Sequence, residues 1–233
     1  MKKVCKGRGA VSNPPGRFEK VTTWAVGDDE EGASDGGKVA ATQLSVDRTR
    51  SIIRRNESPD IAFDQSINPY LGCEHGCVYC YARPSHNYLG LSAGKDFESR
   101  IFVKPEAGIL LRQELSKRNY RCRTIALGTN TDPYQPIERK ALITRSILEV
   151  LSEFNHPVSI VTKSARVTRD LNLLADMARR RLIKVFLSVT TLSRRLAMKL
   201  EPRASTPESR LSAVRELCAA GIPTGVMVAP VIP

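Results

Sequence analysis

Short apolar runs alternate with longer amphipathic stretches along the chain after about Asp60. This alternation is typical of repeated βα units, in which each strand is followed by a helix that covers the sheet. It predicts strands at residues 66–72, 124–128, 158–162, 184–189 and 224–228, and helices at residues 105–117, 138–154, 168–180 and 206–220. Because parallel strands need helical crossovers, the series predicts an α/β protein with a parallel sheet.

Five repeats in one series favour a barrel or a partial barrel over a sandwich. The last apolar run is followed by Val231-Ile232-Pro233, with no helix or closing strand after it. Proteins usually avoid leaving a hydrophobic strand unpaired at the edge of a sheet. We therefore expect a partial parallel βα barrel that is truncated after its fifth strand, with an exposed edge near Val228.

The first 60 residues show little hydrophobic periodicity. Asn13-Pro14-Pro15-Gly16 and the glycine-rich acidic residues 27–37 are typical of loops or disorder. We expect residues 1–60 to form a flexible tail with one short ordered piece at residues 51–56. Residues 61–233 should form the core domain.

The chain offers no segment of about 18 consecutive apolar residues, and its first 11 residues lack the apolar stretch of a secretory signal. We expect a cytoplasmic protein without a membrane partner. Thiols stay reduced in that compartment, so cysteines that cluster in the sequence indicate a metal site rather than disulfides.

Three of the six cysteines, Cys73, Cys77 and Cys80, form a CxxxCxxC motif at the end of the first predicted strand. Three thiolates on one short loop can ligate a cubane iron–sulfur cluster and leave one iron open for a substrate or cofactor. The alternatives are a Cys3His zinc site completed by His75 or His86, and a buried trio without a metal. The remaining cysteines stand alone and are expected to be incidental thiols: Cys5, Cys122 and Cys218.

The CxxxCxxC spacing, with an aromatic residue just before the third cysteine, resembles the signature of radical SAM proteins. The run Cys77-Val78-Tyr79-Cys80-Tyr81-Ala82 is similar to spore photoproduct lyase and its uncharacterised bacterial relatives. Later segments resemble those relatives more than the lyase itself: Leu200-Glu201-Pro202-Arg203-Ala204, Ala219-Ala220-Gly221-Ile222-Pro223 and Val228-Ala229-Pro230-Val231-Ile232-Pro233. The resemblance covers about residues 61–233.

This resemblance implies an enzyme whose 4Fe-4S cluster, held by the three loop cysteines, cleaves S-adenosylmethionine reductively to a 5′-deoxyadenosyl radical. The substrate is unknown. It also implies an external one-electron donor of the flavodoxin or ferredoxin type, and a cofactor site at the ends of the strands. Tyr79 would lie beside the adenine, and Lys163 would bind the methionine carboxylate.

The place of the family's Gly-Gly-Glu segment is taken by a different sequence here, so its members are candidates without individual roles: Gly128, Thr129, Asn130, Thr131 and Asp132. Asp132 is the best anion for the methionine ammonium, or else it forms a turn before Pro133. Ser188 and Thr190 alternate toward one side of the fourth strand and can reach the ribose.

Glu201 and Arg203 follow the fourth strand in a Glu-Pro-Arg run. They either contact the ligand or pair with each other on the surface, where an ion pair contributes little. The formal net charge of +12 is compatible with an anionic partner such as nucleic acid.

Two other functions stay open. A DNA photoproduct lyase is favoured by the lyase-like motif and the positive charge. Against it, the lyase carries a hydrogen-donating cysteine near the end of its second strand, and residues 124–132 contain no cysteine. The other alternative is a non-catalytic zinc or nucleic-acid-binding protein.

Overall fold

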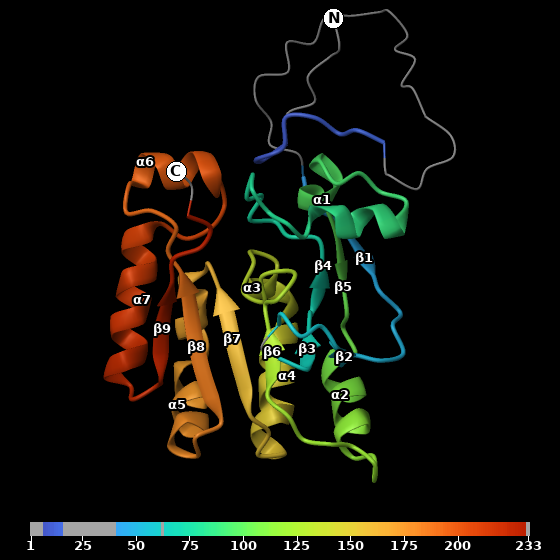
Figure 1. Ribbon diagram of the computed structural model, residues 1–233, viewed down its shortest axis with the longest axis vertical. Coiled ribbons are helices and arrows are strands. Elements are labelled where there is room, and N and C mark those ends of the chain that lie inside the picture. The colour runs from blue at the N-terminus through green and yellow to red at the C-terminus, as the bar shows by residue number, and fades with distance from the viewer. Residues whose placement is uncertain (1–6, 16–40, 62, 232–233) are drawn as a thin grey trace, which may run out of the picture.

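The main sheet of the protein has six strands in the order β2-β3-β6-β7-β8-β9 (Figure 1). The structure, a computed structural model, describes residues 7–15, 41–61 and 63–231. Five neighbouring strands run parallel: β3 (Gln65–Ile67), β6 (Ile125–Leu127), β7 (Val158–Thr162), β8 (Ile183–Ser188) and β9 (Thr224–Met227). The short β2 (Arg54–Arg55) lies antiparallel beside β3. The predicted α/β class is therefore confirmed.

The sheet is open, with β2 and β9 as its edges in the part of the chain that the structure describes. Val226 on β9 and Val228 just after it are 45% and 63% exposed. The apolar edge that the sequence predicts near Val228 is therefore present. Truncation of a barrel after the fifth strand stays a prediction.

The prediction of one continuous strand at residues 66–72 is wrong, because the structure divides this segment between two sheets. Pro69 separates β3 from β4 (Tyr70–Leu71), and proline cannot donate to a strand ladder. β4 pairs with β5 (Arg100–Val103), which in turn pairs with β1 (Gln43–Val46). This small second sheet was not predicted from the sequence. Its strand β4 ends two residues before Cys73.

The last part of the expected tail is built into both sheets. It contributes β1 to the small sheet and β2 to the main one. Ile52 and Ile53 are 2% and 8% exposed and belong to the main hydrophobic core, so the short ordered piece at residues 51–56 packs against the sheet as expected. Ordered structure therefore begins before residue 61. Residues 1–6 and 16–40 of the expected tail lie outside the described residues.

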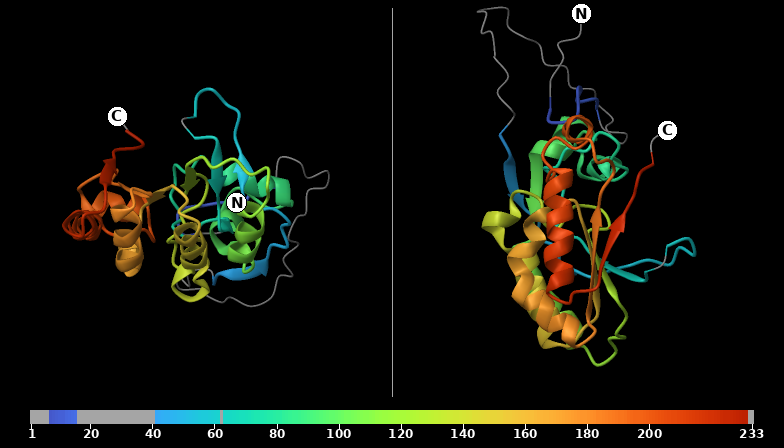
Figure 2. Two further views of the ribbon diagram at one scale, coloured as in Figure 1. Left: turned by 90° about the horizontal axis from the view of Figure 1, so that it is seen from below. Right: turned by 90° about the vertical axis from the view of Figure 1, so that its left-hand side faces the viewer.

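Helices α4 (Ile143–Glu153), α5 (Leu171–Arg179) and α7 (Pro207–Ala219) cover one face of the main sheet (Figure 2). α2 (Ala107–Leu115) packs against α4. The predicted helix at residues 138–154 is interrupted at Leu142, whose positive φ of 52° ends a first short helix, α3 (Glu138–Ala141). A 3-10 helix, η2 (Ala165–Asp170), precedes α5.

Three further helical segments were not predicted, and each lies between predicted elements: η1 (Arg83–Leu89), α1 (Lys95–Ser99) and α6 (Arg194–Leu200). They are short, and none shows the repeated apolar spacing of a longer helix. Among the described helices, none is both long and apolar enough to cross a membrane.

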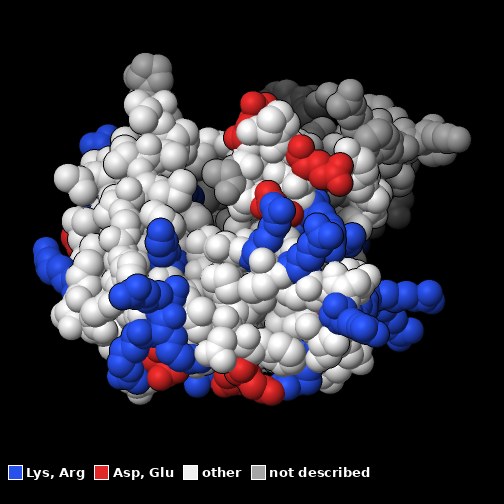
Figure 3. Space-filling model, turned by 60° about the horizontal axis from the view of Figure 1, so that its bottom comes forward, with Lys and Arg blue, Asp and Glu red and all other residues white. Residues whose placement is uncertain are grey.

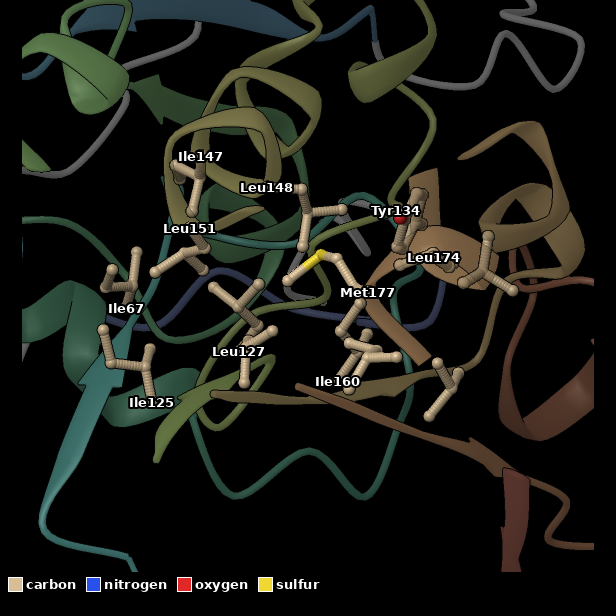
Figure 4. Close-up of a cluster of buried hydrophobic side chains, with 14 of the residues drawn as sticks. Ile67, Ile125, Leu127, Tyr134, Ile147, Leu148, Leu151, Ile160, Leu174 and Met177 are labelled. Atoms are coloured by element: carbon tan, nitrogen blue, oxygen red, sulfur yellow. The ribbon is translucent and has the colours of Figure 1, made fainter. Parts of the chain in front are cut away.

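The core lies between the parallel strands and the helices that cover them. Ile67, Leu127 and Ile160 come from three neighbouring strands and meet Leu148 of α4 and Met177 of α5 (Figure 4). All five side chains are completely buried. Close packing of this kind leaves little freedom to the strands, and it therefore fixes where the loops at their C-terminal ends begin.

Candidate functional site

The residues predicted to form a site gather at one end of the sheet, where the parallel strands finish (Figure 1). The cysteine loop follows β4, residues 128–132 follow β6, Lys163 follows β7, and Ser188 ends β8. Neighbouring parallel strands end at the same edge of a sheet, and binding sites of α/β proteins form there. The sheet order thus brings together segments that are far apart in the sequence.

The three loop cysteines are free thiols packed into a partly apolar environment. Cys73 and Cys77 are 8% and 7% exposed, and Cys80 is half-buried. Cys73 and Cys80 pack in one cluster with Phe97. Burial and then the charge of Cys73 raise the pKa of the Cys77 thiol, and burial also raises that of Cys80. The loop therefore holds Cys73 and Cys77 largely out of water and Cys80 partly so.

This donor set fits a cubane cluster better than a single ion. Thiolates are the ligands that iron–sulfur clusters use, and each cysteine there binds a different iron atom. In residues 7–15, 41–61 and 63–231, no three His, Cys, Asp or Glu side chains form a group that could hold one metal ion. His86 bonds to the carbonyl of Arg100 at 2.9 Å, and Nδ1 of His75 lies 3.4 Å from Asp132. His75 also interacts with Cys73, so the zinc interpretation stays an alternative that metal analysis decides.

Four predicted residues meet in one polar network beside the loop. Glu201, which is 3% exposed, accepts hydrogen bonds from Tyr79 and from Thr190, the latter at 2.9 Å. The ammonium of Lys163 lies 3.8 Å from Glu201 Oε1 and 5.6 Å from the centre of the Tyr79 ring. The positive charge of Lys163 acts to lower the pKa of both Cys77 and Cys80, against the effect of burial. The network therefore places a cation next to the thiols.

Arg210 is a member of this network that the sequence analysis missed. It is 1% exposed on α7, forms an ion pair with Glu201, and donates to the carbonyls of Ser188 and Ser205 at 2.8 Å each. Burial acts to raise the pKa of Glu201, but the hydrogen bond and charge of Arg210 outweigh it and hold that pKa below its ordinary value.

A sequence signal for Arg210 does exist. α7 buries Pro207, Arg210, Ala213 and Leu217. A charged residue three positions before a buried alanine and seven before a buried leucine lies on the core face of a helix. Such a residue needs a buried partner, and here the partner is Glu201.

The loop after β6 is tied to the segment that leads to the cysteines. Asn68 accepts hydrogen bonds from the backbone N–H groups of Asn130 and Thr131 at 3.0 and 3.3 Å, and its amide donates to Thr129 at 3.3 Å. The Thr131 hydroxyl donates to the carbonyl of Tyr70 at 2.8 Å. Asn68 was also missed, and it organises this loop through its own amide.

Asp132 is buried, and hydrogen bonds within the protein use both of its carboxylate oxygens. Oδ1 accepts from the Thr162 hydroxyl at 2.7 Å and from the N–H of Tyr134 at 2.8 Å, and Oδ2 accepts from the N–H of Lys163 at 2.7 Å. Burial acts to raise its pKa, but the charge of His75 and these bonds lower that pKa to about 2. The contact with Tyr134 is the turn that the second interpretation of Asp132 predicts.

Gly128 packs directly against the end of β7. Its φ is +87°, and an added Cβ would lie 2.1 Å from the carbonyl oxygen of Val161. We predict that Gly128→Ala destabilises the protein by more than the roughly 1–2 kcal/mol of a left-handed conformation alone. Urea unfolding measures this, and Gly90→Ala is the matched control, because Gly90 has φ +67° with no atom within 4 Å of an added Cβ. Equal losses in the two variants would contradict the predicted overlap.

The two remaining predicted residues take different positions. Ser188 is 5% exposed, and its backbone carbonyl is held by Arg210. Arg203 contacts the cysteine loop: its guanidinium donates to Glu74 at 3.2 Å and its N–H to the carbonyl of His75 at 3.2 Å. A surface pair between Glu201 and Arg203 was one of the two expectations. It is wrong, because each has a different partner.

Comparison with known proteins agrees with this geometry. The family model of the radical SAM superfamily matches residues 67–233. An uncharacterized protein of Mycobacterium tuberculosis is 39% identical over 181 residues, which are 76% of this chain and 53% of that protein. One of Methanocaldococcus jannaschii is 32% identical over 72% of this chain and 60% of its own length. The chain thus spans about half the length of the curated relatives it matches.

Solved structures of spore photoproduct lyase share the fold. The complex with dinucleoside spore photoproduct superimposes with a TM-score of 0.55 at 22% identity, over 81% of this chain and 51% of the lyase. A variant with bound AdoMet and the same photoproduct gives a TM-score of 0.54 at 22% identity, over 80% and 50% of the two chains.

Proposed function

Because this chain belongs to the radical SAM superfamily, we propose that Cys73, Cys77 and Cys80 hold a 4Fe-4S cluster with which the protein cleaves S-adenosylmethionine reductively. The observation that carries the proposal is the position of three free thiols beside the Lys163 and Glu201 network, at the strand ends. When bound, the reduced cluster supplies the electron that breaks the S–C5′ bond, which yields methionine and a 5′-deoxyadenosyl radical. The substrate of that radical is not identified.

The protein's own residues bind and orient the cofactor in this proposal. The Tyr79 ring lies beside the Lys163 ammonium, and its hydroxyl is held by Glu201 and by Thr190, the latter at 3.2 Å. Lys163 supplies the positive charge that a carboxylate needs. Gly128, Thr129 and Asn130 are partly exposed at the same strand ends, whereas Thr131 is buried, and Arg203 holds the cysteine loop through Glu74.

The role of Asp132 changes in the light of its hydrogen bonds. Both oxygens are used inside the protein, so we propose that it sets the position of Lys163 rather than binding the methionine ammonium as its main task. Ser188 and Thr190 remain candidates for the ribose. Thr190 is already bonded to Glu201, and so it has the less free hydroxyl of the two.

Lys163 is the residue whose charge we expect to matter most for cofactor binding. We predict that Lys163→Met weakens the binding of S-adenosylmethionine by about ten- to a hundredfold, since a hydrogen bond to a charged group contributes about 1.5–3 kcal/mol. Calorimetric titration of the reconstituted protein measures this. Lys199→Met, an exposed lysine on α6, is the control and should bind as the wild type does. Unchanged affinity in Lys163→Met would remove the carboxylate role.

The experiment that tests the function is anaerobic reconstitution with iron and sulfide, followed by an assay for 5′-deoxyadenosine with dithionite and S-adenosylmethionine. A brown protein that forms 5′-deoxyadenosine supports the proposal. A colourless protein that binds zinc supports the non-catalytic alternative. Because the chain matches only 53% and 60% of the length of these two relatives, a form extended to their length should be assayed in parallel.

A DNA photoproduct lyase is the second candidate, favoured by the shared fold. Two observations weigh against it. Residues 124–132 contain no cysteine that could donate hydrogen at the end of the second predicted strand. Lys and Arg side chains also gather on the face at the start of the parallel strands, seen when the bottom of Figure 1 comes forward (Figure 3). That end is opposite the cysteine loop, so this group of cations would not contact a nucleic acid bound at the strand ends.

Partners, location and domain limits follow from the same proposal. A flavodoxin or ferredoxin would deliver the electron, and a reducing cytoplasm would keep the three thiols free. Residues 61–233 would be the core domain, with β1 and β2 added to it from the preceding residues.

A further inference from the structure

Residues 7–13 lie against the cysteine loop and α1, at the same end of the molecule as the other strand-end loops (Figure 1). We call this segment the strap. An added Cβ at Gly9 would lie 1.9 Å from the carbonyl oxygen of Gly76 and 3.2 Å from a methyl group of Val78. The strap backbone therefore rests directly on the backbone that precedes Cys77.

The carboxylate of Glu98, which is completely buried, holds the strap in place. It accepts hydrogen bonds from three successive backbone N–H groups, those of Arg8, Gly9 and Ala10, at 2.6, 3.0 and 2.7 Å. Arg83 adds an ion pair at 2.5 Å. A buried charge is tolerated only when it is paired and hydrogen-bonded. Without the strap, Glu98 would lose three of these four interactions.

Glu98 belongs to α1, and α1 forms one wall of the cysteine site. Phe97, its neighbour, packs against Cys73 and Cys80. The carbonyl of Phe97 accepts the N–H of Cys73 at 2.9 Å. A movement of α1 would therefore displace the cysteine loop, because α1 contacts it through both a side chain and the backbone.

The far end of the strap is fixed to the start of the same helix. The carbonyl of Ser12 accepts the N–H of Lys95 at 3.3 Å, and the side chain of Asn13 accepts the N–H of Asp96 at 3.0 Å. These are N–H groups of the first helical turn, which have no partner within a helix. The strap thus contacts α1 at both of its ends and the loop between them.

Arg8 links the strap to the charged side chains of the loop. Its guanidinium bonds to Thr42 and to the carbonyl of Glu98, and Nη2 lies 3.7 Å from Oε1 of Glu74. Glu74 is 4% exposed and stands between the first two cysteines of the motif. The buried carboxylate of Glu74 is thus paired with Arg8 of the strap and with Arg203, and these contacts restrict the conformations that the cysteine loop can adopt.

We propose that the strap is a positioning element of the cysteine site, which holds the loop against α1 and shields the thiols from solvent on this side. In this proposal Arg8, Gly9 and Glu98 act through the loop and α1, because the contacts described above are with the protein. The inference rests on the proposed function only for the identity of the group that the thiols bind.

The test is the rate at which iodoacetamide alkylates each cysteine in the full chain, read by mass spectrometry of its peptides. Gly9→Val pushes the strap off Gly76, and alkylation of Cys73 and Cys77 should then rise at least about tenfold, because one lost hydrogen bond to a charged group shifts an opening equilibrium by that much. Ser12→Ala is the matched control, since Ser12 is exposed and contributes its carbonyl. The exposed Cys122 serves as an internal reference whose rate should not change.

Two further measurements separate the possible outcomes. Circular dichroism reports whether Gly9→Val remains folded; if it unfolds, Glu98→Gln, which keeps the shape but removes the charge, decides in its place. After reconstitution, iron should be lost in air faster from the variants than from the wild type. Wild-type alkylation rates at Cys73 and Cys77 in a folded variant overturn the strap proposal, whether or not a cluster binds. A wild type that takes up no cluster overturns the proposed function and leaves the alkylation result to decide on the strap.

Discussion

Replacing Cys77 by alanine is expected to remove the cluster and to reduce the formation of 5′-deoxyadenosine to background. The wild type should bind about four iron atoms per chain, as one cubane cluster holds. Two remaining thiolates do not hold a cubane that keeps an open iron. The loss is measured by iron content, by absorbance in the thiolate-to-iron charge-transfer bands and by product formation. The same result is expected for Cys73→Ala and Cys80→Ala.

Cys122→Ala and Cys218→Ala are the matched controls for this prediction. Both thiols are exposed, and neither is part of the loop. They should bind iron and form product as the wild type does. Wild-type rates in Cys77→Ala, or loss of iron in Cys122→Ala, would show that the loop trio is not the ligand set.

Replacing Arg210 by methionine is expected to cause the largest loss of stability. The change leaves Glu201 buried without its ion-pair partner, and breaking a buried pair costs about 3–5 kcal/mol. For a chain of this size, that lowers the melting temperature by about 6–20 °C. Arg215→Met, on the exposed side of α7, is the control and should stay within about 0.5 kcal/mol of the wild type.

The pH dependence of this loss tests its cause. The pKa of Glu201 is held below its ordinary value, so the stability that its ionised form contributes is present above the unfolded pKa of about 4.3 and is lost as the pH falls through the folded pKa. The difference between wild type and Arg210→Met should therefore narrow in acid, where Glu201 is protonated in both. A difference that stays constant down to acid pH would assign the loss to packing instead.

The same substitution should disturb the site. Glu201 also holds Tyr79 and Thr190 and lies beside Lys163, so its displacement releases three candidates for cofactor contact together. We expect Arg210→Met to weaken S-adenosylmethionine binding at temperatures where it is still folded. Arg210 would then be a positioning residue, because its own contacts are with the protein.

Local signals in the sequence predicted much of the fold. β7 has the bounds that its apolar run predicts, and α7 begins where Thr206 accepts a hydrogen bond from the N–H of Ser209 at 3.2 Å, as an N-cap does. These signals depend on neighbouring residues only. The same holds for the CxxxCxxC spacing, which identified the thiols without reference to the rest of the chain.

Other features have no local signal. The small sheet joins β1, β4 and β5 across about 60 residues of sequence, and its strands are too short for a clear alternation to predict them. The division of the first strand follows from Pro69, whose effect on pairing depends on which neighbours are available. The sequence predicts a tail for the N-terminal residues because they lack hydrophobic periodicity. Their contacts could not be predicted locally, since a partner such as Glu98 lies 88 to 90 residues away.

The sequence by itself determined the parallel α/β class, the thiol trio and most of the strand ends from which a site emerges, because periodicity, caps and ligand spacing act over a few residues. Only the tertiary structure decided which buried charges meet. Glu201 bonds to Tyr79, which is 122 residues away in the sequence, and Glu98 accepts hydrogen bonds from the strap. Asp132 accepts a hydrogen bond from Thr162 of β7, so this carboxylate already has a partner within the protein. The physical reason is that a buried charge must find a partner, and the order of strands in the sheet, which no local pattern encodes, determines which partners are within reach.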